Sequence, residues 1–289
     1  MSDITRVGVI GSGLMGSGIA EVCARAGLDV TVREVGDKAA KTGRERIERS
    51  LSRGVKAGKL TDSARHAVLS RITVTTDLAA LDDRDLVIEA ATENPQVKKE
   101  LFAEVDKVVK RADAILATNT SSIPIIEVAR ATTRPGQVLG LHFFNPVPVQ
   151  KLVEVIPSIL TPAETAERAT GFVTSVLGKT AVAAPDRSGF VVNALLVPYL
   201  LSAIRMLEAG HVSAADIDTG MELGCAHPMG PLKLSDLIGL DTLQSVAESL
   251  YAEYAQPTYA PPPLLRRMTA AGLHGRKSGR GFYDYQEQR

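Results

Sequence analysis

The segment from residue 138 to 156 contains a histidine and a glutamate that could act as an acid–base pair. Apolar runs around His142 and around Glu154 each predict a short strand. Pro146 and Pro148 lie between the runs, and neither can continue a strand, because proline lacks an amide donor and has a fixed φ. If the turn sets the strands side by side, the carboxylate can orient the imidazole and stabilise its protonated form. The alternative is a core histidine bonded to backbone and an unrelated strand glutamate.

A glycine-rich turn near the N-terminus predicts a dinucleotide site. It follows a short apolar strand, precedes apolar residues at helical spacing, and is followed by a strand that ends on Glu34. Strand, turn, helix, strand and acid within about 30 residues is the layout of a dinucleotide-binding unit, in which the helix amides face the phosphates. A tight turn without a ligand is the alternative. The predicted cofactor contacts in the turn are Gly11, Ser12, Gly13, Leu14, Met15 and Gly16.

The acid at position 34 favours NAD over NADP. The Glu34 carboxylate can accept hydrogen bonds from the adenosine ribose hydroxyls, and it would repel a 2′-phosphate. Arg33 beside it leaves NADP open, because its guanidinium could pair with that phosphate or point to the other face of the strand. We therefore expect NAD as the cofactor, with NADP possible.

The elements that must position these residues alternate between strand and helix as far as residue 184. This order favours an α/β fold with a doubly wound, mainly parallel sheet of the Rossmann type. Ligands of such sheets bind beyond the carboxyl ends of the strands, where Glu93, Ser121 and His142 would share one crevice. Ser121 and Ser122 have a second interpretation, because either hydroxyl could cap the helix that follows.

After this alternating region the predicted strands stop. We expect residues 1–186 to form a Rossmann-type NAD-binding domain, with a helical arm at about 37–70, and residues 187–289 to form an all-helical domain. The helix expected at 190–209 is apolar nearly all round, and such a helix needs burial on several sides. This surface predicts a homodimer through the C-terminal domain. Asn193 is the polar exception in this helix.

Composition excludes several classes of partner. Lys+Arg and Asp+Glu both number 33, so a formal charge of zero gives no support for a nucleic-acid or membrane-surface partner. No apolar run reaches transmembrane length, and the N-terminus lacks the layout of a signal peptide. Cys23 and Cys225 lie far apart without a metal-binding motif, so we expect both side chains to be buried in the protein. We also expect the protein to be in a reducing compartment, the cytoplasm.

A set of motifs follows in a fixed order along nearly the whole chain. They are Val9–Ala20, Glu93-Asn94 with Lys98, Asn119–Ser122, His142–Pro148, Lys151–Ile156, Gly189–Asn193, His227–Pro231, Gly239–Asp241 and Gly279–Tyr283. In these motifs the sequence resembles the L-3-hydroxyacyl-CoA dehydrogenase family, and most of all its short bacterial members. Ser188 stands where members usually have proline, and Ala194 where they commonly have arginine. Both departures bear on domain closure and dimer contacts rather than on the chemistry.

The resemblance implies a reversible, NAD-dependent oxidation of a short (S)-3-hydroxyacyl-CoA to a 3-oxoacyl-CoA, without a metal. It implies that His142 is the general base and that Glu154 orients it. Ser121 and Asn193 would bind the substrate hydroxyl or the histidine.

The resemblance also implies where the two large ligands lie. Glu93, Lys98 and Asn145 would be near the nicotinamide, and the arm would cover the CoA tail. The expected arm contacts are Ser50 and Lys56, although neighbouring basic residues between 53 and 59 compete with Lys56. Before the resemblance is considered, a solvated helix face is the better interpretation of this basic segment.

Two other functions stay open. A dehydrogenase of the same fold could act on a non-CoA hydroxy acid or a sugar acid such as gulonate, and use of the CoA arm would distinguish the two. The chain could also be a nicotinamide-binding protein without turnover, and the intact pair of His142 and Glu154 argues against that function.

Overall fold

The computed structural model describes residues 3–286, and the chain divides into two compact units. The first unit is Met1–Arg187 and the second is Ser188–Arg289. The division falls inside the segment Pro-Asp-Arg-Ser-Gly, after which no further strand was predicted.

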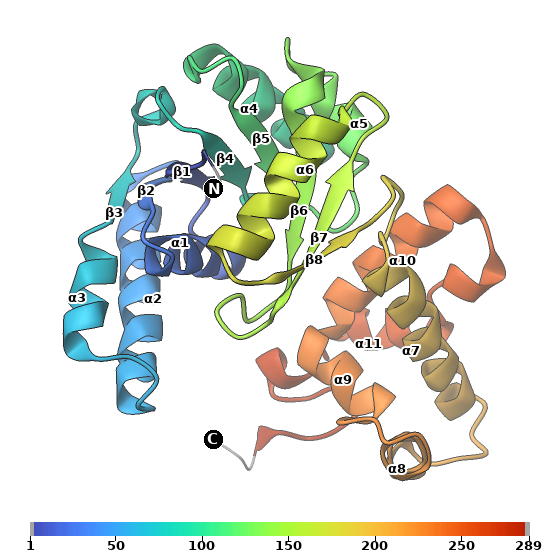
Figure 1. Cartoon of the computed structure of the whole chain (residues 1–289). Coiled ribbons are helices and arrows are strands. Elements are labelled where there is room, and N and C mark those ends of the chain that lie inside the picture. Colours follow the sequence, from blue (N-terminus) through green and yellow to red (C-terminus); the bar gives the residue numbers. More distant parts are fainter. Residues whose placement is uncertain (1–2, 287–289) are drawn as a thin grey trace. The chain divides into compact units, whose positions relative to one another are not determined.

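The first unit is built on a single sheet of eight strands (Figure 1). The strand order is β3-β2-β1-β4-β5-β6-β7-β8, and β6–β7 is the antiparallel pair among otherwise parallel neighbours. The predicted doubly wound, mainly parallel sheet is therefore confirmed. The strands are β1 Arg6–Ile10, β2 Asp29–Arg33, β3 Ile72–Thr75, β4 Leu86–Glu89, β5 Ile115–Thr118, β6 Val138–Phe143, β7 Leu152–Pro157 and β8 Thr180–Ala183.

Helices cover both faces of the sheet, which explains why β4, β5 and β6 are buried along their whole length. Residues of α1, α2, α3 and α6 share one core cluster with the strands, while α4 packs against α5. The helices are α1 Leu14–Arg25, α2 Asp37–Lys56, α3 Asp62–Leu69, α4 Pro95–Val108, α5 Ile125–Ala129 and α6 Ala163–Gly171. Short turns of helix are η1 Leu78–Leu81, η2 Pro135–Gln137 and η3 Phe172–Val176.

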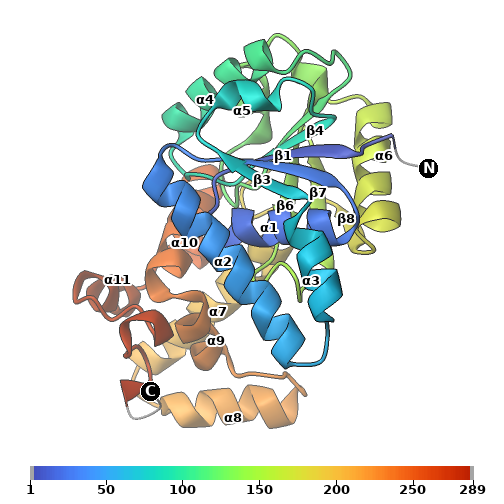
Figure 2. The ribbon, with the colours of Figure 1, turned by 90° about the vertical axis from the view of Figure 1, so that its left-hand side faces the viewer.

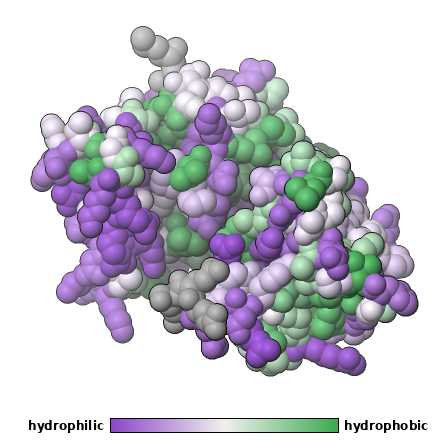
Figure 3. All heavy atoms as spheres, turned by 90° about the horizontal axis from the view of Figure 1, so that it is seen from below, coloured by the Kyte–Doolittle hydropathy of each residue, from purple (hydrophilic) through white to green (hydrophobic). Residues whose placement is uncertain are grey.

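The helices α2 and α3 form the expected arm and run side by side (Figure 2). Along α2 only Gly43, Ile47 and Leu51 are buried, so most of this helix faces solvent. Figure 3 shows hydrophilic side chains over the arm, on the left of that view. The Thr61 hydroxyl accepts a hydrogen bond from the Ala64 amide at 3.1 Å, so threonine, a residue type that favours this position, caps α3.

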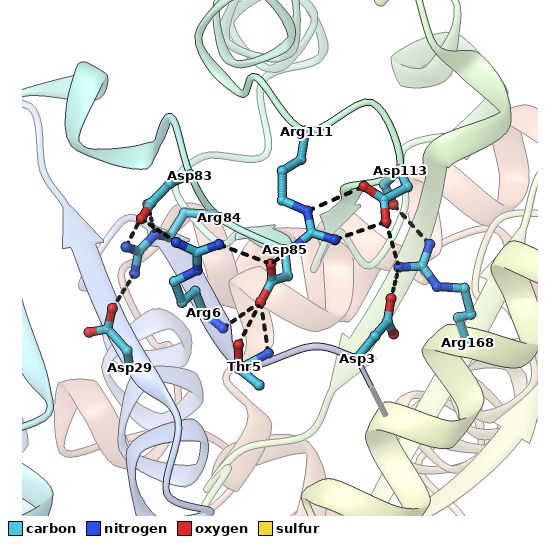
Figure 4. Close-up of polar contacts among 10 residues, drawn as sticks. All are labelled: Asp3, Thr5, Arg6, Asp29, Asp83, Arg84, Asp85, Arg111, Asp113 and Arg168. Carbon is cyan, nitrogen blue, oxygen red and sulfur yellow. Dashed lines mark hydrogen bonds and ion pairs between the residues drawn. The ribbon is translucent and has the colours of Figure 1, made fainter. Parts of the chain in front are cut away.

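A cluster of ion pairs fastens the amino ends of the strands (Figure 4). The buried Asp85 carboxylate accepts hydrogen bonds from the Thr5 and Arg6 amides, both at 2.8 Å, and from Arg111 at 2.7 Å. Arg168 of α6 joins the same edge through Asp3 at 2.6 Å. Because parallel strands place all their carboxyl ends together, this cluster lies at the end of the sheet opposite to the crevice that the sequence predicts.

The second unit is helical around its own core. Its elements are α7 Val192–Glu208, α8 Ala214–Gly224, α9 Pro231–Ile238, α10 Leu240–Tyr254, α11 Pro263–Ala270, η4 Pro257–Tyr259 and η5 Arg276–Ser278. Leu200, Leu201, Ile204 and Leu232 are fully buried in the core. We did not predict α11, because its first residue, Pro263, belongs to the proline-rich stretch of residues 256–263, which is typical of a loop. Proline is well suited to the first turn of a helix, where its missing amide costs nothing.

The helix α6 continues beyond Gly171 as the π-helical turn η3. One expectation about the cysteines is wrong. Cys225 is exposed, because it ends α8 and enters a loop, whereas Cys23 is buried as expected. Burial raises the pKa of the Cys23 thiol to about 12. Within residues 3–286, we find no helix with the length and apolar character needed to cross a membrane.

Candidate active site

His142 and Glu154 meet across the antiparallel pair β6–β7. They are direct partners in the register, so their side chains lie on the same face of the sheet. His142 Nδ1 is 2.7 Å from Glu154 Oε2, and the two residues are only 5% and 0% exposed. An ionised carboxylate only accepts hydrogen bonds, so Nδ1 carries the hydrogen and Nε2 can exchange a proton. The centroid of the Phe144 ring lies 4.7 Å from that of the imidazole, so the phenyl ring limits the movement of the imidazole.

Ser121 lies on the other side of the imidazole, in the loop that follows β5. Its hydroxyl is 3.2 Å from His142 Nε2. The Glu93 carboxylate fixes this loop, since it accepts hydrogen bonds from the Ser121 amide at 2.7 Å and from the Thr120 hydroxyl at 3.0 Å. The alternative that a serine caps α5 is wrong, because the Asp186 carboxylate accepts from the Ile125 and Ile126 amides at 2.6 and 2.8 Å.

A buried ion pair supports the same edge of the sheet. Lys98 of α4 is bonded to Glu89, the last residue of β4, and lies 3.6 Å from Glu93. Glu89 also accepts from the Thr118 hydroxyl and the Ala91 amide, both at 2.8 Å. Lys98 and Glu93 line a cavity of about 170 Å³ together with Met15, Asn119 and Ser121. Glu89 was not predicted from the sequence. An acid at the end of a strand could have indicated it, since the same feature indicated Glu34.

The glycine-rich turn has room for a pyrophosphate. Gly11 has a φ of +88°, a conformation that glycine adopts without strain. A Cβ atom at Gly16 would collide with the Gly11 carbonyl, whereas no atom lies within 4 Å of the position that a Cβ would take at Gly13. The turn is therefore closed toward its own strand and open toward a ligand, as a dinucleotide phosphate requires.

A pocket of about 610 Å³ adjoins this turn at the position expected for the adenosine. Glu34 lines it and accepts a hydrogen bond from the Ser12 hydroxyl at 2.8 Å and another from the Ser12 amide. Arg46 of α2 donates to the Ser12 carbonyl at 2.6 Å, a contact that our sequence analysis did not predict. Arg33 is half-buried, and its Nε has no hydrogen-bond partner among residues 3–286. Leu14 is exposed beside the turn.

The remaining predicted residues are distributed over three elements. Asn145 is exposed in the turn that follows β6. Ser50 lies in α2 and Lys56 is its last residue. Asn193 is in the first turn of α7 and belongs to the second unit.

Models of two domains of one protein family match the chain. The model of the 3-hydroxyacyl-CoA dehydrogenase NAD-binding domain matches residues 6–187, and that of the C-terminal domain matches residues 189–285. The chain belongs to the 3-hydroxyacyl-CoA dehydrogenase family. It is thus an NAD-dependent oxidoreductase, and the glycine-rich turn lies in its NAD-binding domain.

Individual members of the 3-hydroxyacyl-CoA dehydrogenase family are similar over the full length. A 3-hydroxybutyryl-CoA dehydrogenase of Mycobacterium tuberculosis (strain ATCC 25618 / H37Rv) is 58% identical over 286 residues, which are 99% of this chain and 100% of the relative. The crystal structure of FadB2 from M. tuberculosis has a TM-score of 0.97 and 58% identity, covering 98% of this chain and 99% of that one. The structure of (S)-3-hydroxybutyryl-CoA dehydrogenase PaaH1 from Ralstonia eutropha has a TM-score of 0.94 and 44% identity, covering 98% and 100%.

Proposed function

We propose that the protein catalyses the reversible oxidation of a short (S)-3-hydroxyacyl-CoA, 3-hydroxybutyryl-CoA in particular, to the 3-oxoacyl-CoA. The observation that carries this proposal is the buried pair of His142 and Glu154 at the edge of the sheet where the glycine-rich turn lies. The names of the similar enzymes agree with it.

The residues of the first unit fit NAD, which supplies the hydride acceptor when bound. Gly11 to Gly16 would hold the pyrophosphate, and Glu34 would accept from the adenosine ribose hydroxyls. Glu93, Lys98 and Asn145 would lie on the nicotinamide side, and the first two line the cavity of about 170 Å³. Arg33 is the residue through which NADP could also be used.

The proton step belongs to His142. Its Nε2 takes the proton of the C3 hydroxyl as the C–H bond at C3 breaks, and the imidazolium returns that proton in the reverse direction. Glu154 stabilises the imidazolium and holds the ring through Nδ1. The Ser121 hydroxyl, 3.2 Å from Nε2, can donate to the substrate oxygen. Asn193 keeps the role that the resemblance implies, a hydrogen bond to the substrate hydroxyl or to the histidine.

We also propose roles for the larger parts of the chain. Residues 1–186 would act as the NAD-binding domain, whose arm at about 37–70 covers the CoA tail through Ser50 and Lys56. Residues 187–289 would contribute to the substrate site and to a homodimer in the cytoplasm. Leu195 of α7 and Leu223 of α8 are 73% and 82% exposed, and a dimer interface would bury such apolar side chains.

The proposal is tested by following NADH absorbance with acetoacetyl-CoA, acetoacetate and a sugar acid as separate substrates. We expect turnover of acetoacetyl-CoA and very little of free acetoacetate, because binding of the tail positions the reacting carbon. Equal rates on acetoacetate and acetoacetyl-CoA would assign the protein to the class that acts on non-CoA acids. NADH binding without turnover of any substrate would make it a non-catalytic nicotinamide-binding protein.

A further inference from the structure

Strand β6 extends beyond its neighbour β5 at the edge of the sheet where His142 lies. The register of β5 with β6 ends at the pair Thr118 and Gly140, whereas β6 continues to Phe143. Strand β7 accompanies β6 to this end, and the pair of His142 with Glu154 belongs to that register. In the described part of the chain, the sheet thus pairs residues 141–143 with β7 alone. Backbone amides that face the β5 side there need another acceptor.

Asn119, the first residue after β5, supplies this acceptor with its side chain. Its Oδ1 accepts a hydrogen bond from the Phe143 amide at 2.8 Å. The two residues are 24 positions apart, so the contact is not the local turn that asparagine side chains commonly form. Phe143 is only 2% exposed, and a buried amide without an acceptor is costly. Asn119 is itself fixed, because its amide donates to the Glu89 carbonyl at 2.7 Å.

The hydrogen bond from Phe143 to Asn119 acts on the peptide group that follows His142. The nitrogen of Phe143 is covalently bonded to the carbonyl carbon of His142, and the peptide unit is planar. An acceptor at this N–H therefore fixes the orientation of that plane and the ψ angle of His142. Strand β7 holds the other edge of the same residue through the register. The direction in which the imidazole leaves the backbone thus depends on Asn119 as well as on β7.

Asn119 also begins the loop that carries Ser121. Strand β5 has to end before Ser121, because the serine hydroxyl reaches His142 Nε2 at 3.2 Å from this loop. Strand β6 has to continue to His142, because Glu154 meets the imidazole across the pair β6–β7. Asn119 satisfies both requirements. Its backbone enters the loop, while its side chain continues the hydrogen bonding that β5 would otherwise give to β6.

We propose that Asn119 is a positioning residue for His142, which holds Nε2 at the correct place relative to Ser121 and to the substrate hydroxyl. This inference rests on the proposed function, in which Nε2 exchanges the proton of the C3 hydroxyl. A side-chain amide suits the task, because it does not titrate and adds no charge to the site. The effect on rate can be large, since a displacement of about 1 Å can cost roughly 10²-fold.

The first test compares Asn119→Ala with Thr161→Val. The Thr161 hydroxyl donates to the Val138 carbonyl at 2.7 Å, so the control removes a side-chain hydrogen bond from the other end of β6. We expect Asn119→Ala to lower kcat with acetoacetyl-CoA about 10–100-fold, while the Kd of NADH changes much less. Thr161→Val should leave kcat close to that of the wild type. Equal losses of kcat in the two variants would assign both bonds to general support of the strand and overturn the inference.

Removal of the donor tests whether Asn119 acts through the Phe143 amide. Replacing Phe143 by its α-hydroxy analogue exchanges the N–H for an ester oxygen and leaves the Asn119 side chain intact. This change should lower kcat about as much as Asn119→Ala, and the combination should be no slower than either change alone. Fully multiplicative losses would show that the amide of Asn119 has another task, such as a ligand contact, and would refute positioning through Phe143.

A measurement without substrate separates this inference from the proposed function. In Asn119→Ala the Phe143 amide hydrogen should exchange faster than in the wild type, and the NMR signal of the His142 Nδ1 hydrogen should broaden. Thr161→Val should change neither signal. An unchanged His142 signal in Asn119→Ala would overturn the inference even if kcat fell. Failure of the wild type to reduce acetoacetyl-CoA would refute the proposed function, while the two signals would still test whether Asn119 orients the imidazole.

Discussion

Lys98 and Glu89 form an ion pair whose side chains are only 2% and 1% exposed. The pair links α4 to the carboxyl end of β4, and its lysine lines the cavity next to Ser121. Both charges are withdrawn from water, so each depends on the other for compensation. The Thr118 hydroxyl and the Ala91 amide complete the hydrogen bonding of the carboxylate.

Glu89→Gln should destabilise the protein and weaken NADH binding. Leaving one charge of a buried pair uncompensated costs about 3–5 kcal/mol, and the glutamine amide recovers only part of this. We expect Lys98→Met in the Glu89→Gln background to restore thermal stability but not NADH binding. Thermal denaturation and NADH fluorescence titration measure the two effects, with Lys107→Met as an exposed control on the same helix. A double variant no more stable than Glu89→Gln would show that the pair is not coupled.

Glu34→Ala should relax the preference for NADH. The wild type is expected to favour NADH because the Glu34 carboxylate would repel a 2′-phosphate. Loss of a hydrogen bond to a charged group corresponds to roughly 1.5–3 kcal/mol, so kcat/KM with NADH should fall about tenfold or more. Arg33→Ala in the same background should remove any gain with NADPH. The measurement is initial rates with both cofactors, and a wild type that is faster with NADPH would contradict the assignment.

Stability at acid pH should depend on Asp106. Burial tends to raise the pKa of its carboxyl, but hydrogen bonds from Thr133 at 2.6 and 2.8 Å and from Arg134 at 2.6 Å outweigh burial and hold that pKa below 3.8. A depressed pKa in the folded state stabilises the protein above the unfolded pKa, and this stabilisation is lost as pH falls through the folded pKa. Asp106→Asn should therefore be less stable than wild type at pH 7.

The same variant should lose part of the pH dependence. Urea denaturation between pH 7 and about pH 3 should show the wild-type and Asp106→Asn free energies of unfolding converging as the carboxylate is protonated. Curves that stay parallel over the whole range would mean that the hydrogen bonds to Asp106 do not distinguish its protonation states.

Local patterns were sufficient to predict much of the fold and the central pair of the site. The glycine-rich turn, the strand alternation and the cap at Thr61 depend on neighbours in the sequence, so residue types alone indicate them. The meeting of His142 with Glu154 needed one further assumption, that the proline turn pairs its flanking strands. The antiparallel register bears this out.

Contacts between distant segments could not be predicted in this way. Asp186 caps α5 from a position 60 residues further along the chain, and no local pattern relates the two. Glu89 looks like any acid that ends a buried strand, and its partner Lys98 lies on the next helix. Such pairs are selected by the tertiary packing, which a periodicity argument does not contain.

The catalytic pair should act as one unit. Removing a general base costs about 10²–10⁴-fold, so His142→Ala should lose roughly that factor in kcat. NADH binding should be nearly unchanged, because the histidine serves the substrate. Glu154→Gln should lose less, since the imidazole remains but its tautomer and orientation are held less well. Single-turnover rates and NADH titrations of both variants measure these effects.

The double variant decides whether Glu154 acts only through His142. Two groups that work through one another have strongly non-additive losses. His142→Ala with Glu154→Gln should therefore be about as slow as His142→Ala alone. Fully multiplicative losses in kcat would mean that the carboxylate has a separate task, such as holding β6 and β7 together at the register of residues 142 and 154. Thermal denaturation of the wild type, both single variants and the double variant distinguishes these outcomes. If Glu154 has a purely structural role, Glu154→Gln should lower the stability of the His142→Ala variant by as much as it lowers that of the wild type.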